Sequence, residues 1–244
     1  MRNHTFKKIT ALLPAVLATA ALLSVCGMAA EPVDAKSSEG FVMVSDVMPN
    51  VLQEIRYFSE YNFVGARIDG YRAPVALLTK EAAEALKRAG DAFAKDGYVI
   101  KIYDSYRPQT AVNHFVRWAE DLDDVKMKPY FYPDEEKQTL FEKGYIAAQS
   151  SHSRGSTVDM TLVNMLTGEE IDVGGHFDYF GPLSHPDYEG VTPEQAANRM
   201  YIQSVMLDNG FDYYPEEWWH FTLRDEPYPE TYFDFPVDFL RWTK

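Results

Sequence analysis

The chain has 244 residues with 23 basic and 37 acidic side chains, which gives a formal net charge of −14. A chain this acidic repels polyanions, which argues strongly against nucleic acid or anionic lipid as a partner. It contains a single cysteine, so no internal disulfide can form and the stability of the fold has to come from a hydrophobic core.

Residues 1–30 have the features of a secretory signal. A basic start is followed by the apolar run ITALLPAVLATAALLSVCGMAA. Pro14 interrupts this run and small residues end it, which favours cleavage after Ala30 over a membrane span. Cys26 lies in LLSVC, which approaches a bacterial lipobox but has Val25 at the position of the usual glycine or alanine, so plain cleavage and lipidation both stay open. We expect an exported chain, periplasmic or secreted, with membrane attachment only through a lipid on Cys26.

The remainder has the size of one ordinary domain. Removing the signal leaves about 214 residues and makes the net charge −17, because the signal holds three basic and no acidic residues. The polar segment EPVDAKSSEG, residues 31–40, predicts a tether, and residues 41–244 form the expected domain.

The first half of this domain predicts an extended entry followed by a helix, a strand and a second helix. FVMVSDVM, from Phe41, indicates an extended segment, and RYFSEYNFVG indicates an irregular one. Thr79 suits a helix cap and Gly97 a helix end, with apolar residues recurring at helical spacing between them. YVIKIYD, residues 98–104, predicts a strand, and the chain turns at Pro108 into a second helix.

The second half predicts a hairpin, a third helix and a closing strand. Residues 121–137 are charged and contain prolines, which indicates a surface excursion, with a lid as one interpretation. TVDMTLV and EEIDVG, separated by NMLTG, predict the hairpin. The third helix is capped by Thr192, has Pro193 at its first position and ends before Gly210. EWWHFTL closes the set as a strand, and the aromatic clusters YFYP and FDYY are expected in the core or at its rim. The fold class is α+β, a small, mostly antiparallel sheet flanked by helices.

The stretch SSHSRGSTVDMTLV sets His152 and Asp159 seven residues apart. One regular strand would aim residues at this odd spacing to opposite faces. Gly155 allows a turn between them, so that His152 lies on a loop and Asp159 enters the following strand. Imidazole and carboxylate are both zinc ligands, and this spacing lets both reach one ion. A serine-rich turn with a surface histidine and a capping aspartate is the alternative at this point.

A second piece is PEEWWHF, where Glu217 precedes His220 by three residues. Zinc held by two histidines and one aspartate keeps a position for water, and a glutamate beside the last ligand suits the role of general base. The same pattern also occurs by chance around buried tryptophan pairs. Non-haem iron takes a chemically identical ligand set, but such sites commonly begin with a histidine and a carboxylate two residues apart, so this spacing disfavours iron.

A third piece is YDSYRP, which puts Arg107 where a strand gives way to a helix, a common place for functional residues. Its guanidinium suits an oxyanion that develops in a transition state. A structural salt bridge with Asp104 or another acid is the alternative. Three other histidines, at positions 114, 176 and 185, are interpreted as packing, surface or loop residues near a site, and not as ligands.

Together these pieces resemble the D-alanyl-D-alanine dipeptidases of the VanX type, which are zinc D,D-peptidases that share a fold with the hedgehog signalling domain. The family pattern S-x-H-x-x-G-x-A-x-D is met by Ser150, His152, Gly155 and Asp159, and Thr157 replaces its alanine. EWWH supplies E-x-x-H, and YRP, AVNHFVRW and RYFSEYNFVG also match. The resemblance runs from about residue 42 to residue 224.

The resemblance implies zinc-dependent hydrolysis of D-Ala-D-Ala in cell-wall metabolism, with one zinc ion per chain. His152, Asp159 and His220 would hold the zinc. Glu217 would act as the base, and Arg107 would polarise the scissile carbonyl and steady its oxyanion.

The resemblance also implies how the substrate's free amino group is recognised. Asp178, in HFDYFG, matches the family aspartate that pairs with this group, and Tyr57 and Ser150 look like further contacts at the amine end. An acid facing a buried ammonium penalises longer peptides by ~2–5 kcal/mol, which favours a dipeptidase. Two other functions are weighed against it: a D,D- or L,D-carboxypeptidase acting on peptidoglycan stem peptides, and a zinc-bearing wall-binding protein without activity, which the acidic Glu217 disfavours.

Overall fold

The computed structural model describes residues 38–240. The predicted signal with Cys26, and residues 31–37 of the predicted tether, lie outside this range. Within residues 38–240, every helix is too short or too polar to cross a membrane.

A five-stranded sheet forms the centre of the domain, with strand order β2-β4-β5-β7-β6. One edge pair is parallel and the other three pairs are antiparallel, which confirms the predicted mostly antiparallel sheet. A separate pair, β1 and β3, is also antiparallel. The strands are β1 (Phe41–Met43), β2 (Leu52–Gln53), β3 (Leu77–Thr79), β4 (Tyr98–Asp104), β5 (Thr157–Asn164), β6 (Phe211–Tyr214) and β7 (Glu217–Leu223).

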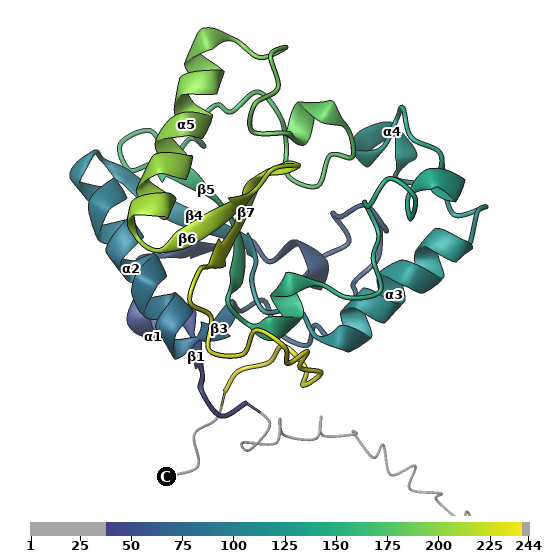
Figure 1. Ribbon diagram of the computed structural model, residues 1–244, viewed down its shortest axis with the longest axis horizontal. Coiled ribbons are helices and arrows are strands. Elements are labelled where there is room, and N and C mark those ends of the chain that lie inside the picture. Colours follow the sequence, from purple (N-terminus) through teal and green to yellow (C-terminus); the bar gives the residue numbers. More distant parts are fainter. Residues whose placement is uncertain (1–37, 241–244) are drawn as a thin grey trace, which may run out of the picture. The chain divides into compact units, whose positions relative to one another are not determined.

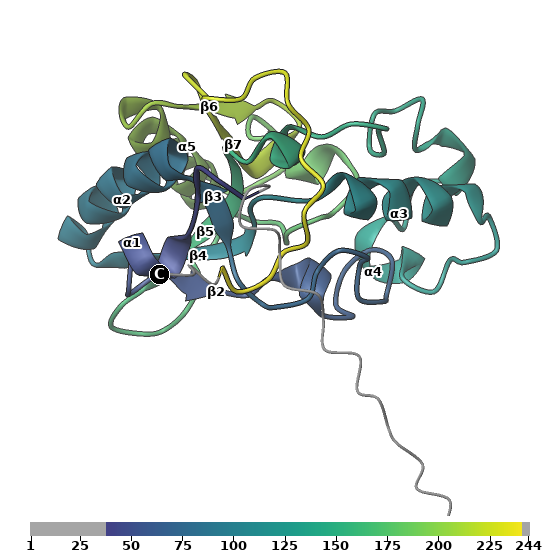
Figure 2. The ribbon, with the colours of Figure 1, turned by 90° about the horizontal axis from the view of Figure 1, so that it is seen from below.

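Helices lie on both sides of this sheet, as the α+β prediction requires. Helices α2 and α5 pack together on one side, and α3 and α4 lie on the other (Figures 1 and 2). The helices are α1 (Val44–Val47), α2 (Lys80–Lys95), α3 (Gln109–Glu120), α4 (Lys128–Phe131) and α5 (Pro193–Asp208).

The two long helices begin where their capping residues predict. The Thr79 hydroxyl accepts a hydrogen bond from the Ala82 amide, and the inward face of α2 is fully buried. At the start of α5, the side chains of Thr192 and Gln195 each accept a hydrogen bond from the other's backbone amide, which completes a capping box with Pro193 at the first helical position. Both helices therefore start from local sequence signals, and their apolar faces then pack on the sheet.

Some elements differ from the prediction. The strand at Phe41 ends after three residues, and α1 follows where extended chain was expected. The predicted surface excursion at residues 121–137 contains the short helix α4. Phe131 and Tyr132 within it are fully buried, as predicted for the YFYP cluster, and the Tyr132 ring meets Trp118 of α3. The returning limb of the predicted hairpin forms only a single bridge, between Val163 and Glu170. FDYY, expected only in the core or at its rim, pairs as β6.

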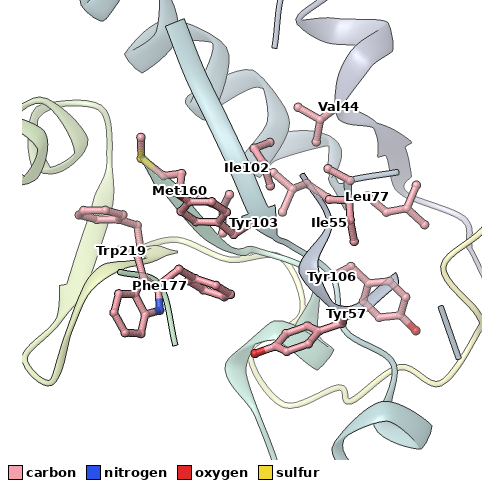
Figure 3. Close-up of a cluster of buried hydrophobic side chains, with 14 of the residues drawn as sticks. Val44, Ile55, Tyr57, Leu77, Ile102, Tyr103, Tyr106, Met160, Phe177 and Trp219 are labelled. Carbon is pink, nitrogen blue, oxygen red and sulfur yellow. The ribbon is translucent and has the colours of Figure 1, made fainter. Parts of the chain in front are cut away.

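The core occupies both faces of the central strands. Ile102 and Met160 are register partners and share the face that α2 covers. On the other face, Phe177 stacks on Tyr103 at 4.8 Å and meets Trp219 at 5.2 Å, as Figure 3 shows. Because β5 is buried along seven of its eight residues, it holds a central and fixed position between β4 and β7.

Gly155 is a position where the fold requires glycine. Its φ is +85°, and a Cβ there would lie 2.2 Å from the Phe41 ring. Gly168 has a similar φ of +74° but open space around it. We predict that Gly168→Ala costs about 1–2 kcal/mol from backbone strain alone, and that Gly155→Ala costs roughly 1–3 kcal/mol more from overpacking. Urea unfolding of both variants measures the difference, and equal losses would contradict this explanation.

Candidate metal centre

Three polar side chains form a row across adjacent strands of the sheet. Asp104 on β4 is the register partner of Asp159 on β5, and Asp159 is in turn the partner of His220 on β7. Residues directly opposite one another in antiparallel strands point to the same face, with Cβ atoms about 4.5–5.5 Å apart. The sheet itself therefore gathers these three groups in one place.

A β-bulge makes this row possible. The register between β4 and β5 shifts between Ile102 and Asp104, so that Asp104 leaves the face of Ile102 and joins the face of Asp159. In a regular strand, residues two apart would share a face. Bulges often occur next to active sites because they re-aim a side chain in this way.

His152 reaches the row from a short 3₁₀ turn, Ser151–Arg154, just before β5. The Ser150 hydroxyl accepts a hydrogen bond from the His152 amide at one end of the turn, and Gly155 ends it in the left-handed conformation. His152 Nε2 then lies 3.3 Å from Asp159 Oδ2. This division between a turn and the following strand is the one that the sequence predicts.

The groups of His152, Asp159 and His220 converge, with one possible ligand atom from each lying within 4.8 Å of the other two. His152 Nε2, Asp159 Oδ1 and His220 Nδ1 are all buried and have no hydrogen-bond partner among the described residues. Buried polar atoms without partners are unfavourable unless a ligand satisfies them. Two imidazole nitrogens and one carboxylate match a zinc site that keeps one position for water. The residues therefore fit a zinc ion.

Neighbouring groups fix which nitrogen each imidazole presents. His152 Nδ1 donates to the Ser105 carbonyl at 2.7 Å, which leaves Nε2 for a metal. His220 Nε2 lies 3.2 Å from Ser151 Oγ, which leaves Nδ1 for the metal. Neither contact could be predicted from the sequence, because no local signal marks a carbonyl or hydroxyl that meets a distant ring.

Thr157, which replaces the alanine of the family pattern, lies close to the ligand group. It is fully buried, and its hydroxyl lies 2.9 Å from that of Thr222, its register partner on β7. The Thr222 hydroxyl is in turn 3.5 Å from His220 Nε2. The extra hydroxyl is thus paired with another hydroxyl, and Asp159 keeps its position beside the two histidines.

The electrostatics of the site favour a cation. Burial alone would raise the pKa of Asp159, but the adjacent His152 and His220 lower it well below its usual range. Burial lowers the pKa of His220, yet the nearby carboxylates of Asp159 and Glu217 outweigh this and raise it to about 9. The carboxylates thus stabilise positive charge beside them, which a divalent ion would supply.

Glu217 lies beside the same imidazole. Its Oε2 is 3.3 Å from His220 Nδ1, and its side chain is about one-third exposed. Residues three apart in a regular strand face opposite sides, but the register between β6 and β7 shifts between Tyr213 and Tyr214. At this irregular pairing, the Glu217 carboxylate lies on the same side of the sheet as the His220 ring. It stays accessible from the cavity.

Arg107 forms one wall of the site and also makes the salt bridge that the sequence analysis considered. Its Nε donates to Asp104 Oδ2 at 2.9 Å, while its guanidinium packs 4.9 Å from the centre of the Tyr57 ring. The other oxygen of the fully buried Asp104 accepts from the Tyr71 hydroxyl at 2.6 Å. Tyr71 and Asp104 thus fix the orientation of Arg107, and the role of Tyr71 was missed because it comes from a distant loop.

Asp178, Tyr57 and Ser150 line the same cavity, which has a volume of about 460 Å³. The Tyr57 hydroxyl donates to Asp178 Oδ1 at 3.1 Å, while Asp178 Oδ2 has no hydrogen-bond partner within residues 38–240. Burial raises the pKa of Asp178 well above its usual range. Among the described non-glycine residues, Asp178 alone has a positive φ, of 63°, and such strain is concentrated at functional sites. A cationic group in the cavity would both pair with this acid and favour its charged form.

The other histidines lie outside this cluster. His114 Nδ1 accepts a hydrogen bond from the Asp69 amide at 3.0 Å. His176 packs its ring against Phe131 and Tyr179. Neither these two nor His185 belongs to the group of possible metal ligands found in residues 38–240.

A family model and curated relatives match most of the chain. The Peptidase M15 family model, described as D-ala-D-ala dipeptidase, matches residues 37–238. The chain is 40% identical over 198 residues to a D-alanyl-D-alanine dipeptidase of Enterococcus faecium, covering 81% of this chain and 98% of that protein. It is 41% identical over 197 residues to one of Streptomyces coelicolor, with the same two coverages. A crystal structure of a mutant of the vancomycin resistance D,D-pentapeptidase VanY, in complex with Zn(II), aligns at 15% identity over 63% of this chain and 76% of that chain, with a TM-score of 0.38.

Proposed function

The chain belongs to the D-Ala-D-Ala dipeptidase family of the M15 peptidases, and from this we propose that it hydrolyses the dipeptide D-alanyl-D-alanine with the help of one zinc ion. The observation that carries the proposal is a single cavity lined by the ligand group His152, Asp159 and His220, by Glu217, and by the buried acid Asp178. The ligand group can bind the metal ion, and Asp178 can pair with a free amino group of the substrate.

His152, Asp159 and His220 would hold the zinc ion, which would supply Lewis acidity to the scissile carbonyl and to a water molecule. Glu217 lies 3.3 Å from one of the ligand imidazoles and is accessible from the cavity, so its carboxylate can take a proton from the attacking water. The same carboxyl group then gives this proton to the departing amine. Glu217 thus acts first as the base and then as the acid of the reaction.

Arg107 stabilises the negative charge that develops on the carbonyl oxygen. Its Nε is occupied by Asp104, so the guanidinium is held rigidly in the cavity wall and does not need to reorganise when the charge develops. Burial alone would lower the pKa of Arg107, but surrounding acidic groups keep it well above its ordinary value, so the side chain stays positively charged.

Asp178 limits the substrate to free dipeptides. Its unpaired Oδ2 and its hydrogen bond from Tyr57 suit an ammonium group at the end of the cavity. A longer peptide would place a neutral amide there, and Asp178 would stay buried without a cationic partner. This acid therefore favours a dipeptidase over the carboxypeptidase alternative.

We also propose that the chain is exported, since residues 1–30 have the features of a cleaved signal. Export places the enzyme where cell-wall fragments are found, which fits recovery of D-alanine better than depletion of D-Ala-D-Ala in the cytoplasm. Mass spectrometry of the exported protein tests this. Cleavage after Ala30 predicts an N-terminal Glu31, lipidation predicts an acylated Cys26, and an intact Met1 terminus on a chain retained in the cytoplasm would contradict export.

Glu217 and His220 separate catalysis from metal binding. We predict that Glu217→Ala keeps zinc but loses about 10²–10⁴-fold in turnover, because general acid–base catalysis contributes about that much. His220→Ala should lose both zinc and turnover, and His114→Ala, outside the site, should change neither. Metal analysis and D-Ala-D-Ala hydrolysis of the three variants provide the measurement. An undiminished rate for Glu217→Ala would show that its assigned role is wrong.

Asp178→Asn tests recognition of the amine. Removing one partner of a buried charge pair costs about 2–5 kcal/mol, so kcat/KM for D-Ala-D-Ala should fall at least ~30-fold. Hydrolysis of N-acetyl-D-Ala-D-Ala, already slow in the wild type, should change little. A wild-type enzyme that cleaves the acetylated and free dipeptides equally well would instead favour the carboxypeptidase alternative.

A further inference from the structure

The segment that carries Asp178 has little regular structure of its own. Between the bridge at Glu170 and the start of α5, the only helical piece in the described chain is the 3₁₀ turn Pro182–Ser184. Asp178 nevertheless holds a positive φ in the middle of this segment. Groups outside the segment must therefore fix its backbone, since an irregular loop has no ladder of hydrogen bonds to do so.

Helix α5 supplies such groups from its first half, and the segment runs past that end of the helix (Figure 1). Gln195 Nε2 donates to Asp172 Oδ2 at 3.0 Å, and Asn198 Nδ2 donates to the Asp172 carbonyl at 2.8 Å. These two contacts hold the start of the segment. Arg199, one residue further along α5, reaches both of its sides.

The Arg199 guanidinium donates to three backbone carbonyls of the segment. Its Nε donates to Val173 at 2.7 Å, and its two terminal nitrogens donate to His185 at 2.6 Å and Leu183 at 2.9 Å. Val173 lies before Asp178 in the chain, and the other two residues lie after it. One side chain thus closes the loop 173–185, with Asp178 at its centre.

Arg199 is buried without an acidic partner in the described part of the chain. It is 3% exposed, and no carboxylate of the described residues forms an ion pair with it. A buried charge without a counterion is costly, and burial indeed lowers the pKa of Arg199. The planar guanidinium can bind several carbonyls at fixed angles, which a lysine ammonium or an apolar side chain cannot do. Burying an unpaired guanidinium costs free energy. Its presence here indicates that the loop needs its backbone carbonyls to be hydrogen-bonded, which apolar packing alone would not provide.

We propose that Arg199 is a positioning residue for substrate recognition. By joining three carbonyls of loop 173–185, it holds Asp178 against Tyr57 at the end of the cavity, where Asp178 meets the substrate's ammonium group. The proposal rests on the proposed function only in that last step. The hydrogen bonds themselves belong to the folded chain and can be tested without a substrate.

Arg199→Met is the primary test, because methionine keeps an apolar stem and removes every donor. We expect kcat/KM for D-Ala-D-Ala to fall about 10-fold or more, mainly through a higher KM, since a misplacement of ~1 Å can cost about 10²-fold. Zinc content and kcat should stay close to those of the wild type. Arg199→Lys should recover only part of the loss. An unchanged KM in Arg199→Met would overturn the proposal.

Lys137 provides a matched control. It is also 3% exposed, and its Nζ donates to three backbone carbonyls, those of Trp118, Asp121 and Asp124, none of which belongs to loop 173–185. Lys137→Met should lower the melting temperature as Arg199→Met does, but leave KM unchanged. If both variants raise KM equally, general destabilisation explains the effect and the proposal is wrong.

A double-mutant cycle identifies the route of the effect. If Arg199 acts through Asp178, then adding Arg199→Met to Asp178→Asn should raise KM by less than about 2-fold, and the preference for D-Ala-D-Ala over its N-acetyl form should not change further. If the increases in KM from the two single substitutions multiply fully in the double variant, Arg199 does not act through Asp178.

Hydrogen exchange distinguishes a failure of this inference from a failure of the proposed function. In Arg199→Met, backbone amides of residues 173–185 should exchange at least 10-fold faster, while those of β5 and β7 stay protected. If the wild type leaves D-Ala-D-Ala uncut, the proposed function is wrong, and the exchange result alone then decides on Arg199. Unchanged exchange in the loop would overturn its positioning role.

Discussion

The site depends on one buried carboxylate, Asp159, held between two imidazoles. Its oxygens lie 3.3 Å from His152 Nε2 and 3.2 Å from His220 Nδ1. Asp159 and His152 are buried, and the His220 side chain is 12% exposed. Such a group is stable only if positive charge is shared among its members, by protons or by a metal ion. The outer nitrogens of both rings already contact Ser105 and Ser151, so the inner ones converge on one point. The need to stabilise the Asp159 carboxylate therefore explains why the sheet and the turn before β5 bring these groups together, and it underlies the proposed chemistry.

The sheet meets this constraint through its register. Pairing of Asp159 with Asp104 on one side and with His220 on the other places three functional groups in a row without help from any loop. The sheet has two irregular pairings. The one between β4 and β5 directs Asp104 towards Arg107, and at the one between β6 and β7 the Glu217 carboxylate lies beside His220. Stable strands thus carry the proposed metal-binding and catalytic groups, whereas the proposed amine end of the cavity lies on an irregular loop that is hydrogen-bonded to α5.

Much of this arrangement could be predicted from local sequence. Thr79 and Thr192 mark the helix starts through capping, and Gly155 between His152 and Asp159 indicates the turn that separates the two ligands. The two register shifts and the contacts of Tyr71 and Arg199 could not be predicted. Each of these depends on residues that are distant in the chain, and neither capping signals nor periodicity contain that information. The roles of the site residues came from the combined order of several motifs, since each motif alone has an ordinary structural explanation.

X-ray absorption at the zinc K-edge of the zinc-loaded protein tests the central claim most directly, because it reports the ligand atoms themselves. The account predicts scattering from two imidazole rings and from oxygen, with zinc–nitrogen and zinc–oxygen distances of about 2.0–2.2 Å, and with one position left to a ligand from solvent. A spectrum with fewer than two imidazoles, or with four protein ligands and no solvent position, would contradict it.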